Sequence, residues 1–561
     1  MVKLVRDPLL ILVVLLGLWA GWWLLKPGYF NMHDDLQMMR QLAMEGCFKD
    51  LQFPCRWTQY MGYGFGFPLF NYYPPLPYLV GEVIRLAGFS FVTTVKITFL
   101  LSVVISGVAM YIFVRELWGR LGGLVSAAFY IWAPYHSLDV FVRGAMNEAW
   151  ALSWFPLILW SSYKLVKEHR FKYIVILALS WFALFTSHNL MVMIFAPVFA
   201  GWVLLWLVRE KAWFVIPRLV VSGIWSFGLA AFFTLPVFLE KGLVKVESMF
   251  VGYYEYVAHF ASIRQLLFSR FWGYGASAWT EADGMSFYVG HTHWVLAIVI
   301  FLLVLLRYLK RRKLDNLLLI TCYFFALGWF ATFMAHSRST PIWLAFPFLK
   351  FVQFPWRFIT LSIFSFSILA GGLIMLLQSL KRSTLLGFVT VVLVVTVIVA
   401  NREFFRPEKM GPLTDKEKFS AAAWELQQTA GIYDYLPRGA KTAPKESQKT
   451  VADVIYSEGQ ITDSSQGTSW AKFNVNIGSD EAKVRINIFQ FPNWKVFVDK
   501  KEVETYIDEK EEWGRMYITI PQGEHEIAVH LYNTPVRTLG NTISLVSWLA
   551  LLTAPVWRKK R

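Results

Sequence analysis

The sequence predicts an α-helical polytopic membrane protein of about twelve transmembrane helices that carries a C-terminal extracytoplasmic β-sandwich. Three observations predict this fold class. Hydrophobic residues make up 56% of the 561 residues and charged residues only 16%, so a single soluble core cannot bury the apolar surface. Apolar runs of bilayer length alternate with short basic links, and after residue 400 the pattern changes to strand-like alternation.

The opening segment, MVKLVRDPLLILVVLLGLWAGWWLL, combines a basic start with a long apolar run. Trp22 and Trp23 stand where a signal peptide would place its small-residue cleavage site, so we expect an uncleaved transmembrane helix. The runs that we expect to cross the bilayer are 8–25, 95–114, 121–138, 149–166, 173–187, 190–208, 216–239, 293–309, 314–335, 357–379, 384–400 and 540–556.

The links between these runs predict the orientation. The basic links are RELWGR, KEHRFK, REKAW, KRRK, the KR at 381–382 and the C-terminal RKKR. Because Lys and Arg mark cytoplasmic loops, both termini are predicted to be cytoplasmic in a multi-pass protein of the cell (plasma) membrane. The net charge of +16 belongs to these links, so nucleic-acid binding is not predicted.

Residues 74–90, PPLPYLVGEVIRLAGFS, are predicted not to cross the membrane, because a crossing there would break the alternation of the links. Three prolines disfavour a regular helix start, and Glu82 and Arg85 interrupt the apolar run. We expect a juxtamembrane or re-entrant element on the outer face.

The region after residue 400 is predicted to form the β-sandwich. Its alternating segments are KFNVNI, KVRINIF, WKVFVD, MYITI and HEIAVHLY. The predicted domains are therefore 1–400, the transmembrane domain; 401–538, the extracytoplasmic β-domain; and 539–561, a last transmembrane helix with a basic cytoplasmic tail. Trp494 could stack on a sugar ring or fill the sandwich core, and core is the commoner fate of a strand Trp.

Two acidic sites share the predicted outer face. Asp34 and Asp35 follow His33 at the outer end of the first helix, whereas Glu148 begins the fourth helix shortly after Arg143. Single charges at this depth often only terminate helices, but charges also persist where they line a watery cavity or perform a function. Because three acids and an arginine share the predicted outer face, we expect a functional site there.

Several motifs carry a resemblance to a known family. Besides HDD at 33–35, they are GYGFGFPLFNYYPPLPYLVG (62–81), RGAMNEAWALSWFPLILW (143–160), SHNL (187–190), FVQFPWRF (351–358) and FPNWKVFVDKKEV (491–503). The layout resembles the C-type fold of integral-membrane glycosyltransferases, the superfamily of oligosaccharyltransferases and protein O-mannosyltransferases. More narrowly, the chain looks like the bacterial membrane proteins labelled 6-pyruvoyl-tetrahydropterin-synthase-related.

The residues of this chain do not fit the pterin chemistry that the second label suggests. A zinc-dependent pterin synthase needs three clustered histidines, whereas His291 and His293 have no third histidine near them in the sequence. The acidic site that the superfamily places in its second outer loop is also reduced here, because Asn147 stands beside Glu148 instead of another acid.

The resemblance implies that a sugar leaves a polyprenyl-phosphate carrier and passes to a glycan, lipid or protein acceptor on the outer face. This chemistry needs a carboxylate base and a positive charge or metal at the departing phosphate. Asp34 or Asp35 is the predicted base, and Glu148 is the third predicted catalytic residue. The predicted substrate-binding residues are His33, Tyr72, Arg143, His188, Arg264 and Arg338.

No cofactor is firmly predicted, but a divalent cation (Mg²⁺ or Mn²⁺) between Asp35 and Glu148 is an alternative, since hard cations favour carboxylate oxygen. The loop 240–292 is long for a membrane connector, and we expect it to cover the sugar pocket. Cys47 and Cys55 share an outer loop, where an oxidising exterior would let them pair.

Two other classes of function stay open. A transporter or flippase of lipid-linked glycans would also line its path with charges, and a non-catalytic cell-envelope assembly protein could keep the same motifs. Transporters carry charges deep within their helices and internal repeats, whereas these helix centres are nearly free of charge and show no clear repeat. A glycosyltransferase is therefore the leading prediction.

Overall fold

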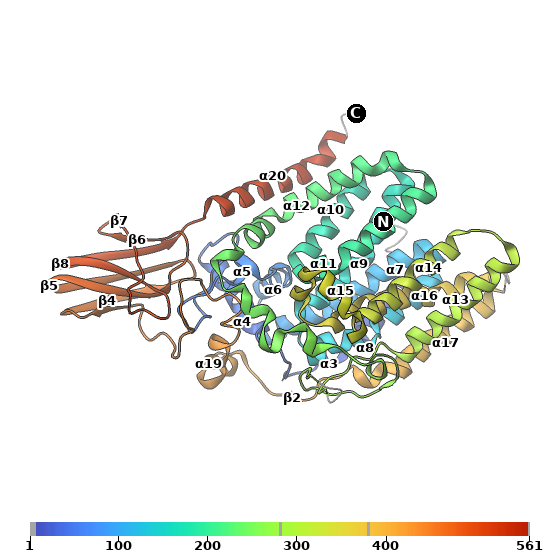
Figure 1. The fold of residues 1–561 in the computed structure, drawn as a ribbon, viewed down its shortest axis with the longest axis horizontal. Coiled ribbons are helices and arrows are strands. Elements are labelled where there is room, and N and C mark those ends of the chain that lie inside the picture. The colour runs from blue at the N-terminus through green and yellow to red at the C-terminus, as the bar shows by residue number, and fades with distance from the viewer. Residues whose placement is uncertain (1–6, 280–282, 379–381, 559–561) are drawn as a thin grey trace. The chain divides into compact units, whose positions relative to one another are not determined.

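The computed structural model describes residues 7–279, 283–378 and 382–558. The basic residues that open the chain, Lys381 of one predicted link and residues 559–561 of the predicted tail lie outside these ranges. The described chain is mostly helical and has a β-sheet near its C-terminus (Figure 1).

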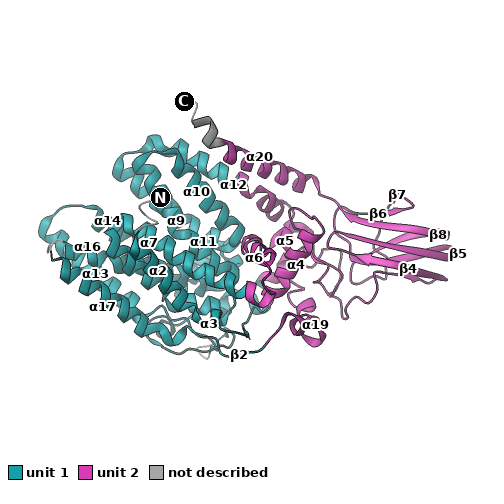
Figure 2. Cartoon of the chain, turned by 180° about the vertical axis from the view of Figure 1, so that it is seen from behind, with its two compact units in different colours: residues 1–35, 95–227, 250–412 teal, residues 36–94, 228–249, 413–561 magenta. Residues whose placement is uncertain are grey.

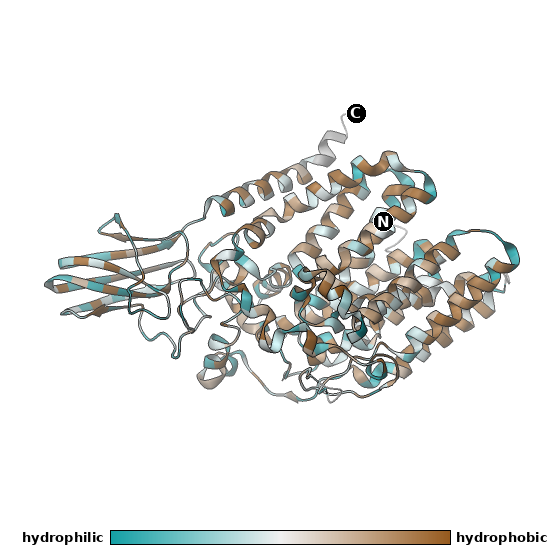
Figure 3. Ribbon diagram, viewed as in Figure 1, coloured by the Kyte–Doolittle hydropathy of each residue, from teal (hydrophilic) through white to brown (hydrophobic). Residues whose placement is uncertain are grey.

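Within the described ranges, seven helical stretches are long and apolar enough to cross a membrane, which is compatible with the predicted membrane protein. They are Phe91–Ile131, Asn189–Glu210, Trp213–Leu239, His291–Arg311, Asn316–Met334, Pro355–Gln378 and Ser383–Phe404. Figure 3 shows hydrophobic residues dominating helices such as α13 (His291–Arg311) and α17 (Ser383–Asn401).

Fewer helices than the predicted twelve or so crossings are both long enough and apolar enough to span a membrane in the described part of the chain. Helices α2 (Pro8–Ala20) and α10 (Phe171–Ser187) are apolar but short. The helices at the fourth and last predicted crossings, α9 (Met146–Glu168) and α20 (Pro535–Arg558), are not among the seven. One physical reason is visible in α9, whose Trp, Ser and Tyr residues and Pro156 make it less apolar than the seven, although few of its residues are charged.

Two of the predicted runs lie in one helical stretch. Helix α7 extends over Phe91–Ile131, and its regular geometry breaks at Gly119, which has φ +77°. The two runs predicted at 95–114 and 121–138 therefore meet at a kink whose left-handed backbone favours glycine.

The chain divides into two compact units, which Figure 2 colours separately. Unit 1 comprises residues 1–35, 95–227 and 250–412. Unit 2 comprises residues 36–94, 228–249 and 413–561. The predicted domains follow the order of the sequence, whereas each unit is assembled from three separated segments. Unit 2 thus contains two stretches that the sequence had placed in the transmembrane domain.

Unit 1 is built around its long helices. Its remaining helices are α3 (Trp22–Leu25), α8 (Pro134–Ser137), α11 (Asn189–Glu210), α14 (Asn316–Met334), α15 (Thr340–Ala345) and α16 (Ile359–Gln378), and α12 (Ile216–Leu239) begins in this unit. Phe155 of α9 stacks on Phe195 of α11 with ring centroids 4.1 Å apart, and Phe364 of α16 meets both rings edge-on. This aromatic packing fixes the helix whose first turn holds Glu148.

Unit 2 contains a six-stranded antiparallel sheet in the order β3-β5-β8-β6-β7, with β4 also paired to β5. The strands are β3 (Ala452–Ile455), β4 (Gly459–Gln466), β5 (Trp470–Phe489), β6 (Trp494–Val498), β7 (Lys501–Val503) and β8 (Arg515–Leu531). Buried and exposed residues alternate along β5, as the sequence pattern predicted.

The predicted sandwich of two separate sheets is replaced by this one hydrogen-bonded sheet. Strands β5 and β8 are 20 and 17 residues long. Each is long enough to pair with several strands along its length, whereas shorter strands would form two separate sheets. Their register shifts between Ile477 and Glu481, and an interruption of this kind bends a strand pair without breaking the sheet. Trp494 is buried at 5% exposure and lies 5.6 Å from the Trp57 ring, so it belongs to the core.

The helices of unit 2 are short except for the last. They are α4 (Gln37–Lys49), α5 (Leu69–Tyr72), α6 (Leu76–Leu86), α18 (Asp415–Lys418), α19 (Ala421–Thr429) and α20. With 11 residues, α6 extends about 16 Å and is too short to cross a bilayer, in agreement with the prediction for 74–90. The prediction that the prolines disfavour a regular helix start was wrong. Pro77 lies in the first turn of α6, where its missing N–H is not needed.

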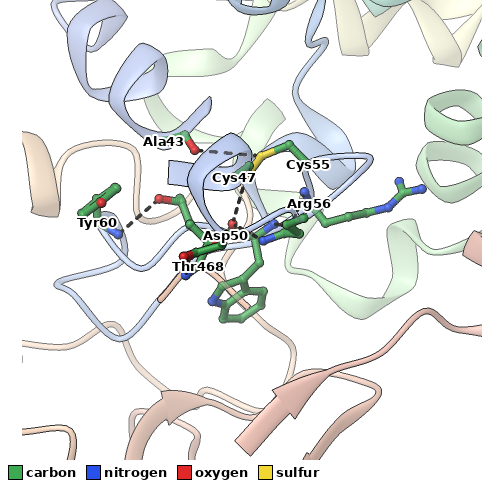
Figure 4. The surroundings of a disulfide bond; sticks show 10 residues. Ala43, Cys47, Asp50, Cys55, Arg56, Tyr60 and Thr468 are labelled. Carbon is green, nitrogen blue, oxygen red and sulfur yellow. Dashed lines mark hydrogen bonds between the residues drawn. A yellow bond between two sulfur atoms is a disulfide. The ribbon is translucent and has the colours of Figure 1, made fainter. Parts of the chain in front are cut away.

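Cys47 and Cys55 form a disulfide with their Cα atoms 5.5 Å apart (Figure 4), so the predicted pairing is present. Within the closed loop, the Asp50 carboxylate accepts a hydrogen bond from the Thr468 hydroxyl at 2.8 Å. The disulfide loop is therefore attached to the segment that leads into β5. Cys322 is free.

Candidate active site

The HDD and RGAMNE segments lie side by side in unit 1. The His33 amide donates to the Val142 carbonyl at 3.0 Å, and the Asp34 amide donates to the Arg143 carbonyl at 2.9 Å. Just before this contact, the short strand β1 (Tyr29–Phe30) pairs with β2 (Met410–Gly411). The structure therefore brings together two predicted motifs that are far apart in the sequence.

Gly144 makes this close approach possible. Its φ is +63°, in the region that favours glycine. A Cβ added at this position would lie 2.4 Å from the Met32 sulfur, which is closer than any real contact. The glycine of the RGAMNE motif therefore lets the HDD segment pack against it.

Glu148 lies at the centre of a buried group of charges, which we call the Glu148 cluster. One carboxylate oxygen, Oε2, is 2.9 Å from Nη2 of Arg143 and accepts from Nε of Arg357 at 3.3 Å. The other, Oε1, accepts from the Tyr135 hydroxyl at 2.7 Å, while Asp139 forms an ion pair with Arg143. Glu148 is 1% exposed and Asp139 0%. Two buried carboxylates thus face two guanidinium groups, an arrangement that is tolerated only when the charges are paired.

Residues of the FVQFPWRF motif hold the two guanidinium groups in place. Arg357 donates to the Gln353 side-chain oxygen at 3.0 Å, and its guanidinium lies 5.0 Å from the Phe354 ring centre. The Arg143 guanidinium lies 4.5 Å from the Trp356 ring centre. Cations over aromatic faces are stabilised by the ring quadrupole.

Arg357, Tyr135 and Asp139 were not among the predicted site residues. Arg357 had a signal in the sequence, since it lies in a motif that carried the resemblance and directly precedes an apolar run. Tyr135 lies near the end of the predicted crossing at 121–138 and Asp139 follows it directly, with nothing in the pattern to single either residue out.

The surroundings decide which acid of the cluster keeps its charge. Burial by itself would raise the pKa of Glu148, which precedes the predicted crossing at 149–166, but the charges of Arg143 and Arg357 lower that pKa to about 2. Burial raises the pKa of Asp139 well above its ordinary value, and the charge of Glu148 adds to the rise. The two guanidinium groups thus favour the ionised form of Glu148, the carboxylate that contacts both of them.

Asp34 and Asp35 differ from Glu148 in being half-buried, although Oδ1 of Asp35 is itself buried. Burial raises the pKa of the neighbouring Tyr29 well above its ordinary value, and the charges of Asp35 and Asp34 raise it further. Both carboxylates therefore lie near the Tyr29 phenol. A half-buried carboxylate beside a buried cationic cluster fits the predicted role of a base.

His33 connects this segment to the loop that was expected to cover the site. Its Nε2 lies 2.9 Å from the Tyr274 carbonyl oxygen, so the ring is attached to the loop backbone. Burial lowers the pKa of His33, the contact with Tyr274 opposes this effect, and the positive charge of Arg143 lowers it further. His33 is therefore uncharged at neutral pH and stands between the loop and the cluster.

His188 caps helix α11 and borders the cluster. Its Nδ1 accepts hydrogen bonds from the backbone amides of Leu190 and Met191 at 3.2 and 3.4 Å. Burial and the charge of Arg357 lower its pKa to about 3, although Glu148 acts in the opposite direction. Because Nδ1 is an acceptor in a neutral ring, the proton resides on Nε2, which can donate to a ligand.

Three predicted substrate-binding residues take no part in the described contacts of the cluster. Tyr72 belongs to unit 2, where its hydroxyl donates to the Glu240 carbonyl at 2.8 Å. Arg264 and Arg338 belong to unit 1 and are exposed. Their role in binding stays a prediction.

The donor set does not fit the predicted divalent cation. Over the described ranges, no three His, Cys, Asp or Glu side chains gather as metal ligands would. Both oxygens of Glu148 are already engaged by Tyr135 and the two arginines. The guanidinium groups occupy the place that a cation would need.

No family model matches the chain, and no curated protein matches it. The conclusion about function therefore rests on the geometry of the Glu148 cluster and the HDD segment.

Proposed function

We propose that this protein is a membrane glycosyltransferase that moves a sugar from a polyprenyl-phosphate carrier to an acceptor on the outer face of the membrane. One observation carries the proposal: the backbone pairing of His33 and Asp34 with Val142 and Arg143. This pairing holds the segment with two half-buried carboxylates against the segment of Arg143, which belongs to the Glu148 cluster with its two guanidinium groups. Carboxylates and guanidinium groups are the charges that such a transfer needs.

Asp34 takes the proton from the acceptor hydroxyl or amide in this mechanism. The acceptor atom forms a bond to the anomeric carbon of the sugar, and the bond from that carbon to the carrier phosphate oxygen breaks. The electron pair leaves with the phosphate, whose charge Arg143 and Arg357 stabilise.

The proposal includes the C-type fold, with the HDD segment and the β-domain outside the cell and both termini in the cytoplasm. A reporter fused near residue 92 tests this topology, because the segment before helix α7 should lie outside. A cytoplasmic reporter at this position would contradict the proposed orientation and with it an outer-face reaction.

The activity is tested with the purified full chain in lipid nanodiscs and a panel of polyprenyl-phosphate sugars. Mass spectrometry should show that at least one donor is consumed when an acceptor extract is added, with release of the carrier phosphate. A donor that binds to the protein but is never consumed would instead support the flippase or the assembly protein. Transport of the labelled donor across the bilayer of proteoliposomes then separates these two alternatives.

A further inference from the structure

A pocket of about 400 Å³ lies in unit 2, between the segment after helix α12 and the segment before the sheet. Two backbone hydrogen bonds help to hold these segments together: the Lys245 amide donates to the Leu436 carbonyl at 2.9 Å, and the Arg438 amide donates to the Leu243 carbonyl at 2.9 Å. The volume falls within the range of small-molecule sites. The pocket is thus built on a fixed backbone pairing between distant parts of the sequence.

The charged side chains that line the pocket are predominantly basic. Lys245, Arg438 and Lys441 contribute cations, and Glu247 pairs with Arg438 at 2.9 Å. The Lys245 ammonium donates to the Lys441 carbonyl at 3.0 Å, and the Lys441 ammonium donates to the Glu509 carbonyl at 2.8 Å. Carbonyl oxygens hold the two ammonium groups in place but do not neutralise them. The lining therefore keeps two positive charges in excess, which an anionic ligand would compensate.

An aromatic ring and hydroxyl groups complete the lining. Tyr433 is 60% exposed, and its backbone carbonyl accepts a hydrogen bond from the Ser248 hydroxyl. Thr442 adds a second, exposed hydroxyl. A ring with an apolar face and a polar edge, next to hydroxyl groups, suits a sugar ring better than a bare ion.

We propose that this pocket binds an anionic saccharide, with its carboxylate or phosphate held by Lys245 and Lys441 and its sugar ring against Tyr433. The inference depends on the lining residues of unit 2 alone. It holds whether or not the Glu148 cluster of unit 1 transfers sugar, and it is tested by binding, without turnover.

The test is calorimetric titration of the full chain in detergent at low salt. The probes are a glucuronate-containing tetrasaccharide, a phosphorylated tetrasaccharide, a neutral tetrasaccharide, inorganic phosphate and a glutamate-rich peptide. At least one of the charged saccharides should bind about tenfold or more tightly than the other three probes, and the stronger of the two identifies the anionic group. Equal binding of the neutral sugar, of phosphate alone or of the peptide would overturn the proposal, as would no binding of either charged saccharide.

Variants then locate the site. Lys245→Gln together with Lys441→Gln should weaken binding of the charged saccharide about tenfold or more, and Tyr433→Ala should weaken it as well. Lys495→Gln removes a lysine that is paired with Glu502 on the sheet, so it serves as the matched control and should leave binding unchanged. Binding at full strength in the double lysine variant would place the ligand elsewhere.

Discussion

Both units of this protein contain a buried group of a glutamate and two arginines, but the two groups differ in what lies beside them. They are Glu148 with Arg143 and Arg357 in unit 1, and Glu240 with Arg537 and Arg56 in unit 2. In unit 1 a second acid balances the charge, and half-buried carboxylates stand next to the cluster. In unit 2 the neighbours are uncharged amides and hydroxyls.

The unit 2 group, which we call the Glu240 cluster, is a buried network of hydrogen bonds and one ion pair. The Glu240 carboxylate accepts from Nε of Arg537 at 2.9 Å and from Asn71 at 3.2 Å. Asn71 accepts in turn from Arg56 at 3.4 Å, and Arg56 also donates to Asn541 at 2.8 Å. Arg537 is 1% and Arg56 4% exposed. The cluster therefore joins three distant segments of unit 2 through buried side chains.

The comparison teaches that a buried glutamate with arginines does not by itself mark an active site. Burial and the nearby charge of Arg537 lower the pKa of Arg56 to about 9, so the like charges of the Glu240 cluster oppose each other. Such a group contributes cohesion, provided that its carboxylate stays in place. What distinguishes the Glu148 cluster is the neighbouring segment with the half-buried Asp34 and Asp35.

The largest effect is expected at a half-buried carboxylate of unit 1. Asp34→Asn should reduce sugar transfer by about 10²–10⁴-fold with normal folding, because a positioned general base contributes that much to the rate. Turnover of the purified variant in nanodiscs measures this loss. Asp35→Asn should have a weaker effect, and Asp480→Asn, an exposed acid of the sheet, is the control. Near wild-type transfer by both variants of the HDD segment would end the catalytic interpretation.

The next largest effect is expected in the stability of unit 2. Glu240→Gln leaves Arg537 and Arg56 buried without their carboxylate, which should destabilise the protein by about 3–5 kcal/mol. The midpoint of thermal unfolding in detergent measures the change. Glu502→Gln breaks an exposed pair with Lys495 in the same unit and should leave the midpoint almost unchanged. Equal midpoints for the Glu240 variant and this control would show that the cluster is not cohesive.

A third substitution separates the roles of the two clusters directly. Glu148→Gln should lower turnover by about 10²-fold, because Arg143 and Arg357 lose the group that positions them. Its unfolding midpoint should fall less than that of Glu240→Gln, because Asp139 still faces Arg143. The two measurements are made on the same preparations. A loss of stability as large as that of the Glu240 variant would make the two clusters equivalent and break the comparison.

The smallest effect is expected from the disulfide of unit 2. Cys47→Ser combined with Cys55→Ser should cost about 2 kcal/mol of stability, because the closed loop is short. Arg56 directly follows Cys55, so the loss reaches the Glu240 cluster and not the site of unit 1. Unfolding midpoints and sugar transfer are measured together, with the wild-type protein in reductant as the control. A fall in transfer without a fall in stability would contradict the division of roles.

The sequence by itself determined the features that arise from local patterns. Apolar runs of the sequence correspond to helices, because a helix satisfies its backbone hydrogen bonds within one segment. The interval between the runs at 95–114 and 121–138 corresponds to the break at Gly119 in α7. Alternating residues became strands for a similarly local reason. The grouping of Asp34, Asp35, Arg143 and Glu148 could also be predicted, since acids and an arginine near predicted helix ends are visible in the sequence.

Only the tertiary structure decided which distant residues meet. Sequence periodicity indicates that a residue is buried, but it does not indicate which residue it contacts. No spacing in the sequence therefore predicted the ion pair of Arg357 with Glu148, or the link from Arg56 through Asn71 to Glu240. The pairing of β5 with β8 into one sheet, where the pattern favoured two, depended on strand length and register. Ion pairs and strand pairing join segments hundreds of residues apart, and their energies depend on burial and geometry that no local pattern contains.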